Sequence, residues 1–236
     1  MSDSTLSSAA ANDWRNSRWL IAVELAVVAV IYLVDYFHWH HLIFFSKTPY
    51  LFLFAWISLR VRRLHWRDIG LRLYQNWWRT LALGILFGAL MEALELFVTQ
   101  PLLVRWLHHY PDLSDFNDLV GNYKLLLIYL ALTWVLAAFG EEMVHRGYLL
   151  NRIADLLRGA PARWIVSMVI ASVVFGFGHY DQGLTGWIEN TLNGLLLGGL
   201  YLYFGRSLAV PIVAHGITDT IDLIIIYLGK YPGMAR

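Results

Sequence analysis

The chain has 236 residues, of which 58% are hydrophobic, 15% aromatic and 15% charged, and its mean hydropathy is +0.52. Soluble domains carry about 25% charged residues, so this composition argues against a soluble single domain, and its many aromatic residues exclude intrinsic disorder. The formal net charge of +1, from 18 basic and 17 acidic residues, would not attract nucleic acid, and we expect no such partner. Without cysteine, the chain has no disulfide, thiol nucleophile or thiolate metal ligand.

Seven apolar segments follow one another along the chain, without the alternation of a β-barrel. A helix crosses the roughly 30 Å core of a bilayer in about 20 residues. The first segment is too long for a signal peptide, and the second, interrupted by Lys47, Pro49 and Arg60, fits either a tilted span or a re-entrant piece. We therefore expect an all-α, polytopic membrane protein with about seven transmembrane segments, forming a single domain over residues 1–236. The segments are 19–37, 42–61, 80–98, 125–139, 164–178, 184–204 and 207–228.

The distribution of arginine predicts how these segments are oriented. Six arginines lie in residues 60–79, which the positive-inside rule places in the cytoplasm, whereas the acidic stretch 100–123 would lie outside. Four more arginines would again lie inside, at positions 146, 152, 158 and 163. The amino terminus is then inside and the carboxyl terminus outside.

A pair of glutamates follows the fourth apolar segment. Ionisable groups at the bilayer centre cost roughly 2.5–3.5 kcal/mol each and need a reason. A helix from about residue 125 to about 157 would run through Glu141 and Glu142, which point about 100° apart, so at most one faces a given cleft. Arg146 lies at the i+4 position from Glu142 and can pair with it, which leaves Glu141 as a candidate general base. Alone, this motif favours a glutamate pair at the membrane exit with Arg146 reaching towards water.

Two histidine motifs follow on later segments. His179 ends the fifth segment and is, alone, typical of an interface residue, whereas His215, Asp219 and Asp222 lie well inside the seventh and are costly unless they line a cavity. A carboxylate with two imidazoles can activate water and stabilise an oxyanion. Counting from the nearest arginines puts Glu141 and His179 near opposite membrane faces, so a shared site needs tilted helices or a water-filled cavity.

Together, these motifs resemble the CPBP family of intramembrane proteases, which includes CAAX prenyl-endopeptidases and bacteriocin-processing and self-immunity proteins. The family pattern is EExxxR, FxxxH and HxxxN or HxxxD, matched in order by Glu141-Glu142 with Arg146, Phe175 with His179, and His215 with Asp219. The resemblance covers residues 125–222, which we expect to form the catalytic core.

The resemblance implies an intramembrane endopeptidase, with a role for each motif residue. Glu141 would activate water with help from His179, and Glu142 and Arg146 would hold the helix. His215 and Asp219 would take the oxyanion-stabilising place. An ionised Asp219 cannot donate a hydrogen bond as asparagine does. Either burial keeps Asp219 protonated, or it accepts from His215 and fixes the tautomer of that ring, and we expect the second. We expect no cofactor.

Three alternatives stay open. The His179, His215 and Glu141 side chains are also a His₂Glu zinc set, which would make the same hydrolase metal-dependent. A non-catalytic immunity or scaffold protein would keep the fold and bind a peptide or a partner. A proton relay would use the carboxylates of Glu92, Glu95, Asp219 and Asp222. The first two, however, more often pair with polar groups such as Asn190 or Asn193 or face the interior between helices.

The expected partners are the lipid bilayer and a membrane-anchored protein or peptide, for which a prenylated C-terminal peptide is the family's best-known example. By analogy we expect an integral multi-pass protein of a prokaryotic cytoplasmic membrane. The sequence does not determine the substrate or the oligomeric state. Two features are expected to be structural: the small-residue pattern at Gly194 and Gly198, and interface histidines at positions 38, 40 and 41.

Overall fold

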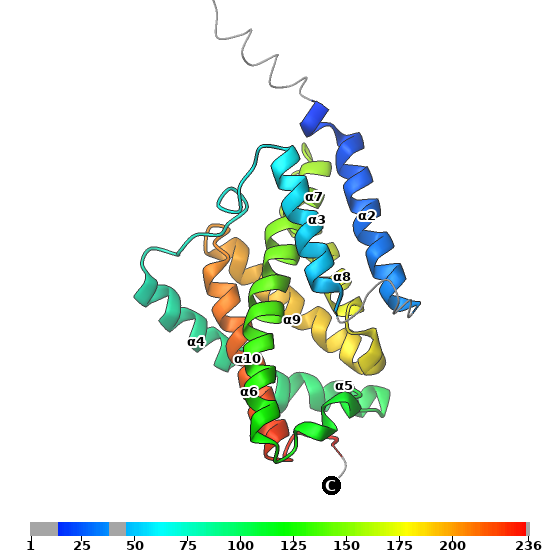
Figure 1. Ribbon diagram of the computed structural model, residues 1–236, viewed down its shortest axis with the longest axis vertical. Helices are drawn as coiled ribbons and strands as arrows, with labels where there is room; N and C mark the ends of the chain where they lie inside the picture. Colours follow the sequence, from blue (N-terminus) through cyan, green and yellow to red (C-terminus); the bar gives the residue numbers. More distant parts are fainter. Residues whose placement is uncertain (1–13, 38–45, 235–236) are drawn as a thin grey trace, which may run out of the picture.

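A computed structural model describes residues 14–37 and 46–234, and this part of the chain consists of helices and turns without a strand (Figure 1). The all-α fold class predicted from the sequence is confirmed. Three elements, η2, η4 and η5, are π-helical, and η1, η3 and η6 are 3₁₀ turns. The elements are η1 (Trp14–Asn16), α2 (Arg18–Tyr36), α3 (Lys47–Val61), α4 (Trp77–Leu94), η2 (Glu95–Thr99), α5 (Gln100–Leu107), η3 (Ser114–Leu119), α6 (Tyr123–Leu132), η4 (Thr133–Glu141), η5 (Met143–Leu149), α7 (Leu150–Leu156), α8 (Arg163–Phe177), η6 (Tyr180–Gln182), α9 (Gly183–Tyr203) and α10 (Ala209–Tyr227).

Within the described residues, four helices are long and apolar enough to cross a membrane: Arg18–Tyr36, Trp77–Leu107, Tyr123–Leu156 and Ala209–Tyr227. Helix α8 and the η6–α9 helix make a fifth candidate, bent by 65°. The expected number of seven spans is therefore not confirmed. Residues 42–45 of the second predicted segment lie outside the described residues, and the 15 residues of α3 reach only about 22 Å.

Glu24 and Asp35, the two acidic residues of the first apolar segment, form contacts that connect α2 to α3. Arg62 pairs with Glu24 at 2.7 Å, and the Ser58 hydroxyl donates to the same carboxylate at 2.6 Å. At the other end of α2, Lys47 lies 3.0 Å from Asp35. These contacts explain how acidic residues are tolerated in an apolar helix.

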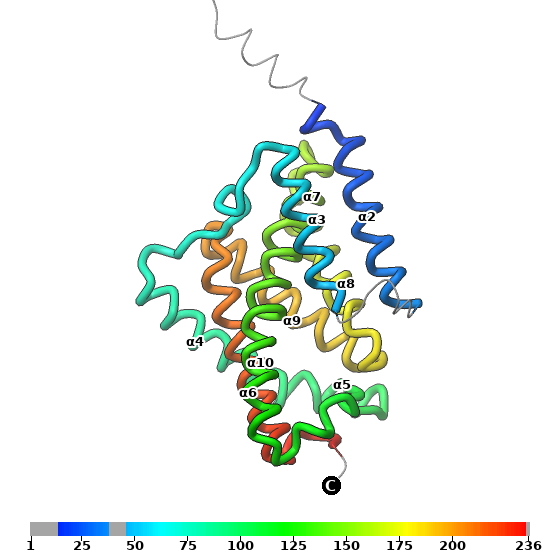
Figure 2. Tube along the Cα trace, in the orientation of Figure 1, coloured from blue at the N-terminus to red at the C-terminus, as the bar shows by residue number. Residues whose placement is uncertain are grey.

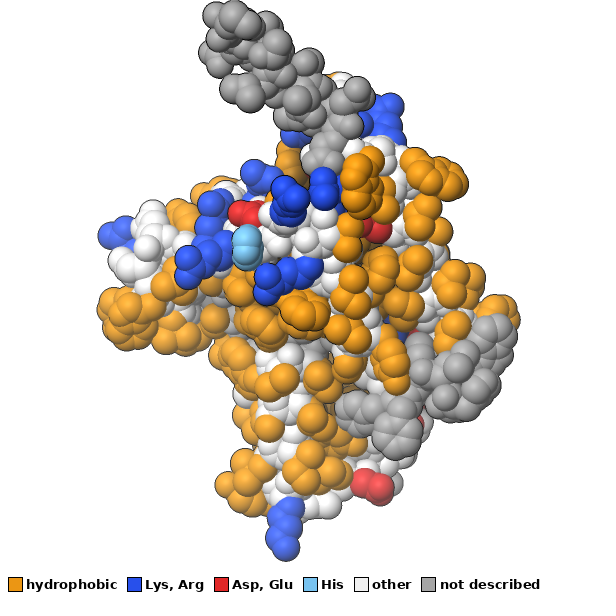
Figure 3. All heavy atoms as spheres, turned by 45° about the horizontal axis from the view of Figure 1, so that its top comes forward, with side chains coloured by type: hydrophobic (Ala, Val, Ile, Leu, Met, Phe, Trp, Pro, Cys, Tyr) orange, Lys and Arg blue, Asp and Glu red, His pale blue; other side chains and the backbone are white. Residues whose placement is uncertain are grey.

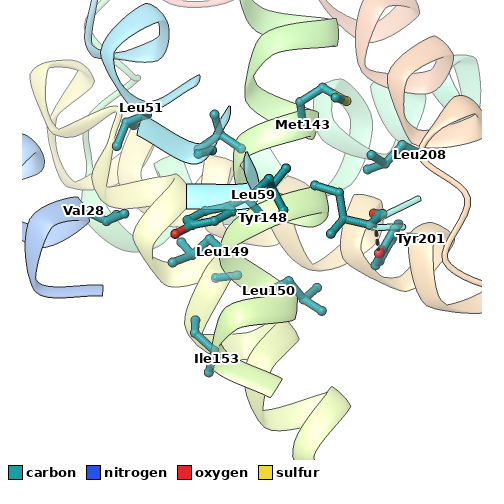
Figure 4. Packing of buried hydrophobic residues seen from close by; sticks show 14 of the residues in the cluster. Val28, Leu51, Leu59, Met143, Tyr148, Leu149, Leu150, Ile153, Tyr201 and Leu208 are labelled. Atoms are coloured by element: carbon teal, nitrogen blue, oxygen red, sulfur yellow. Dashed lines mark hydrogen bonds between the residues drawn. The ribbon is translucent and has the colours of Figure 1, made fainter. Parts of the chain in front are cut away.

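Four elements, α6, η4, η5 and α7, form one continuous helix from Tyr123 to Leu156, which runs through the middle of the bundle (Figures 1 and 2). Its second half supplies the centre of the main core, where Tyr148 and Leu150 are almost fully buried. Figure 4 shows these side chains between α3 and Tyr201 of α9. This core fixes the helix that carries the glutamate pair.

Close helix contacts depend on glycine at several described positions, among them Gly88, Gly194 and Gly198. A Cβ on Gly88 of α4 would lie 2.5 Å from the Ala214 carbonyl of α10. Substituted in the same way, Gly194 and Gly198 of α9 would meet α8 at 3.0 Å and 2.7 Å. The small-residue pattern predicted to permit close packing is confirmed.

Basic side chains gather at the end of the molecule nearest the N-terminal trace (Figure 3). Backbone contacts tie the loops of this end together: Arg18 donates to the Arg158 carbonyl, and Arg72 to the Gly205 carbonyl. The opposite end holds the C-terminus (Figure 1). Arg146 and Arg152, however, are buried within the long helix. They lie on the helix that the sequence predicts from about residue 125 to about 157, which runs from Tyr123 to Leu156.

Candidate active site

One cavity of about 250 Å³ collects the predicted functional residues. Glu141, His179, His215 and Asp219 all line it, although they come from three different helical segments. Glu141 lies near the middle of the 34-residue helix rather than at a membrane exit. His179 lies at the bend between α8 and α9. These positions remove the depth mismatch that counting along the sequence suggests.

The helix is widened where it carries the glutamates. The π-helical element η4 ends at Glu141, and η5 begins at Met143. Widened turns of this kind are frequent at functional sites. Glycine precedes the pair for a steric reason, since a Cβ on Gly140 would lie 2.9 Å from the Thr48 side chain of α3.

The Glu141 carboxylate has one partnered oxygen and one free oxygen. Thr48 donates its hydroxyl to Oε1 of Glu141 at 3.3 Å. Oε2 is buried and has no hydrogen-bond partner within the described part of the chain. This free oxygen belongs to a side chain that lines the cavity, so it can accept a proton from a water molecule there.

Glu142 is fully buried and organises the residues behind the cavity. Its Oε1 accepts from Nη1 of Arg146 at 2.5 Å and from Nδ1 of His215 at 2.9 Å. The predicted Glu142–Arg146 pair is thus confirmed. The guanidinium also donates to the Gly194 carbonyl of α9 at 3.2 Å and lies 4.4 Å from the ring centre of Phe175 of α8. The pair therefore joins the long helix to α8, α9 and α10.

His215 lies between two carboxylates. Besides its Nδ1 contact to Glu142, its Nε2 lies 3.5 Å from Oδ2 of Asp219. Asp219 was expected to fix the tautomer of this ring, but the shorter contact of His215 is to Glu142. A carboxylate that accepts from Nδ1 keeps a hydrogen on that nitrogen and directs Nε2 towards the cavity side.

His179 is held by its own helix. Its Nδ1 donates to the Phe175 carbonyl at 3.1 Å, which leaves Nε2 as the nitrogen for contacts in the cavity. The FxxxH spacing thus supplies both the residue and the carbonyl that orients it.

His145 is a neighbour of the site that the motif reading assigned no role. Its Nδ1 donates to the Glu141 carbonyl at 2.8 Å, and its Nε2 accepts from the Tyr32 hydroxyl at 2.6 Å. Both nitrogens of this buried ring are therefore used to hold the helix at Glu141 against α2. The i,i+4 spacing to Glu141 was visible in the sequence, but the Tyr32 partner, 113 residues away, was not.

Residues 123–221 match a family model named Rce1-like, whose description is "Type II CAAX prenyl endopeptidase Rce1-like". This segment, which we call the Rce1-like segment, is similar to the Rce1-like family. The resemblance drawn from the three motifs is confirmed, and the Rce1-like segment contains all six predicted site residues. That family is one of proteases, and the apolar helices indicate an integral membrane protein. No curated protein and no solved structure matches the chain.

The zinc alternative requires Glu141, His179 and His215 to be arranged as three ligands of one metal ion. Across residues 14–37 and 46–234, no group of three or more histidine, aspartate and glutamate side chains is arranged to hold a metal ion. Glu141, His179 and His215 share the cavity of the Rce1-like segment without forming such a set. The residues as arranged do not fit a zinc centre. Histidines 38, 40 and 41 lie outside the described residues.

A second group of carboxylates lines the other end of the same cavity. Glu95, Glu189 and Asp222, from η2, α9 and α10, are the lining residues that we call the acidic end. Glu95 accepts a hydrogen bond from Asn193, as the sequence predicted for this glutamate. Glu92 is also buried, but neither of its oxygens has a hydrogen-bond partner among the described residues. Glu92 thus has no polar partner of this kind among these residues but faces the interior of the bundle, the other position that the sequence indicated for this pair.

Proposed function

We propose that this protein is an intramembrane endopeptidase that hydrolyses a peptide bond with a water molecule activated by Glu141. The observation that carries the proposal is the convergence of Glu141, His179 and His215 on one cavity within a bundle of apolar helices. The similarity of the Rce1-like segment to a protease family supports the reaction class.

The first step joins water to the scissile carbonyl carbon. Oε2 of Glu141, free of other partners, takes a proton from the water as its oxygen attacks, and Nε2 of His179 orients that water. The carbonyl π electrons move to oxygen, which becomes an oxyanion. His215, as an imidazolium with a hydrogen on each ring nitrogen, donates from Nε2 to this oxyanion, while Glu142 accepts from Nδ1.

The second step breaks the carbon–nitrogen bond. The oxyanion reforms the carbonyl, and the departing nitrogen takes the proton that Glu141 received from water. The products are a carboxylic acid and an amine, and Glu141 is again a carboxylate. Asp219 lies beyond His215 and positions the ring from the other side.

The proposed substrate is a membrane-anchored protein or peptide, since the cavity lies within helices that contact lipid. A prenylated C-terminal peptide is one candidate, on the description of the matching family. We further propose a multi-pass protein of a prokaryotic cytoplasmic membrane, in which the basic end faces the cytoplasm.

The test is hydrolysis of a membrane-anchored peptide by the full chain in proteoliposomes. Glu141→Gln keeps the size of the side chain but cannot take a proton, so we expect no cleavage above the protein-free rate. Asp118→Asn, an exposed carboxylate outside the cavity, is the matched control and should cleave like the parent. Full activity of Glu141→Gln would remove this mechanism.

The same preparation separates the two remaining alternatives. A scaffold protein would bind the peptide without cleaving it in any variant. A zinc-dependent hydrolase would contain one metal ion per chain after washing with chelator and would lose activity when that ion is removed. We expect cleavage that is unchanged by such washing.

A further inference from the structure

Carboxyl groups are the most numerous ionisable side chains that line the cavity. Five of its lining residues are carboxylates: Glu141 and Asp219 at the proposed catalytic site, and Glu95, Glu189 and Asp222 at the acidic end. None of the described residues that line it is a lysine or an arginine. The nearby Arg146 charge is already paired with Glu142.

The acidic end contains a buried acceptor without a partner. Glu189 is only 4% exposed, yet its Oε1 has no hydrogen-bond partner within the described residues. Asp222 has a buried Oδ1 without a donor among the described residues, and it faces the Glu92 carboxyl, with which it can share a proton. Buried acceptors of this kind are costly to leave unpaired, so they indicate that a donor enters from elsewhere.

We propose that the acidic end is a subsite for a positively charged side chain of the peptide substrate. A lysine or arginine inserted there would donate to Glu189 and Asp222 and would offset the negative charge of the cavity. This proposal rests on the proposed function, because it names the substrate class for that same site.

The spacing along α10 sets where the charge belongs in the substrate. Asp222 lies seven residues after His215, which is about 10 Å along a helix. An extended peptide covers about 3.3 Å per residue. The basic residue is therefore expected about three positions from the bond that is cut.

A metal ion fits the acidic end less well than a side chain does. No group of three or more carboxylates or histidines in the described ranges is arranged to hold an ion. A flexible ammonium or guanidinium group can instead contact carboxylates that lie further apart, since it carries several donors.

The test measures binding rather than cleavage, using Glu141→Gln of the full chain in detergent. The probes are fluorescent decapeptides of alanine, leucine and serine that carry a single lysine or, at the same position, norleucine. We expect the best lysine peptide to bind at least about tenfold more tightly than its norleucine partner. Glu189→Gln and, separately, Asp222→Asn added to this background should remove most of that preference and leave norleucine binding unchanged.

The control is Asp118→Asn in the same background, which should keep the full preference. Thermal unfolding of each variant shows whether it is folded. If one of the two substitutions prevents folding, the other still tests the subsite. Equal binding of the lysine and norleucine peptides, including no binding of either, would overturn the subsite. A lysine preference that survives both substitutions would also overturn the subsite. Equal binding would indicate that the carboxyl groups of the acidic end are protonated.

The outcomes for the subsite and for the proposed function are separate. A lysine preference in binding, together with normal cleavage by Glu141→Gln in proteoliposomes, would keep the subsite and reject the mechanism. Loss of cleavage in Glu141→Gln without any lysine preference would keep the mechanism and reject the subsite.

Discussion

The Glu142 carboxylate accepts a hydrogen bond from Nδ1 of His215 at 2.9 Å, across 73 residues of sequence. The same oxygen also accepts from Arg146. One buried carboxylate thus fixes the orientation of the imidazole and balances the guanidinium charge. The second glutamate of the pair is therefore tied to the proposed oxyanion-stabilising histidine as well as to its own helix.

Glu142→Gln should strongly destabilise the protein. The substitution leaves the Arg146 guanidinium, which is 2% exposed, without a negative partner. Breaking a buried pair in this way costs about 3–5 kcal/mol in the free energy of unfolding. Thermal and denaturant unfolding in detergent measure the effect. Adding Arg146→Met to Glu142→Gln removes the unpaired charge and should recover part of the loss, and no recovery would contradict the role assigned to the pair.

Asp219→Asn should retain or raise the rate of peptide hydrolysis. The amide can donate a hydrogen bond to the developing oxyanion, whereas an ionised aspartate cannot. Asp219→Leu, which can neither donate nor accept, is the matched comparison and should lower kcat/KM. A decrease with asparagine as large as that with leucine would show that the negative charge of Asp219 is itself required.

Thr48→Val should lower kcat with little change in KM. Valine has nearly the same shape but cannot donate to Oε1 of Glu141, and hydrogen bonds to charged groups are worth about 1.5–3 kcal/mol. We expect a loss of about tenfold or more, since 1.4 kcal/mol corresponds to a factor of ten. Thr191→Val is the control because its hydroxyl bonds only the Trp187 carbonyl of its own helix. Unchanged activity in Thr48→Val would mean that α3 does not position Glu141.

Gly176→Ala should disturb the contact between α8 and α9. A Cβ at this position would lie 2.0 Å from Oγ1 of Thr191 and 2.5 Å from the Trp187 carbonyl. Overpacking of this kind costs about 1–3 kcal/mol. Gly199→Ala is the matched control, because no atom lies within 4 Å of its added Cβ, and alanine there favours the helix by up to about 1 kcal/mol. Equal unfolding temperatures for the two variants would contradict the close packing.

The sequence predicted the helical class, the three motifs and the Glu142–Arg146 pair, because each depends on apolar runs or on neighbours within one helix. It did not predict the His215–Glu142 bond or the Tyr32–His145 bond, since these join distant segments. The number of spans also escaped prediction. Apolar length does not distinguish a crossing helix from an arm of a bent pair, and α8 and α9 form such a pair.

The depth of the site was hidden for a related reason. The sequence predicts the helix that runs from Tyr123 to Leu156, but its apolar run ends at Phe139, and the glutamate motif alone therefore suggested a membrane exit. Arg146 and His145 are buried in its second half because each has a polar partner, Glu142 and Tyr32 respectively. A hydropathy window does not detect such partners.

The π-helical stretch from Thr133 to Glu141 holds more residues than an α-helix would between the same two ends. A π turn behaves as an insertion that the helix has absorbed. Deleting one residue before Gly140 is therefore expected to return this stretch to an α-helix, and not to rotate its two halves against each other. A homologue with a one-residue gap here can keep the half that faces α10 and the half that carries Glu141 pointing to their present neighbours.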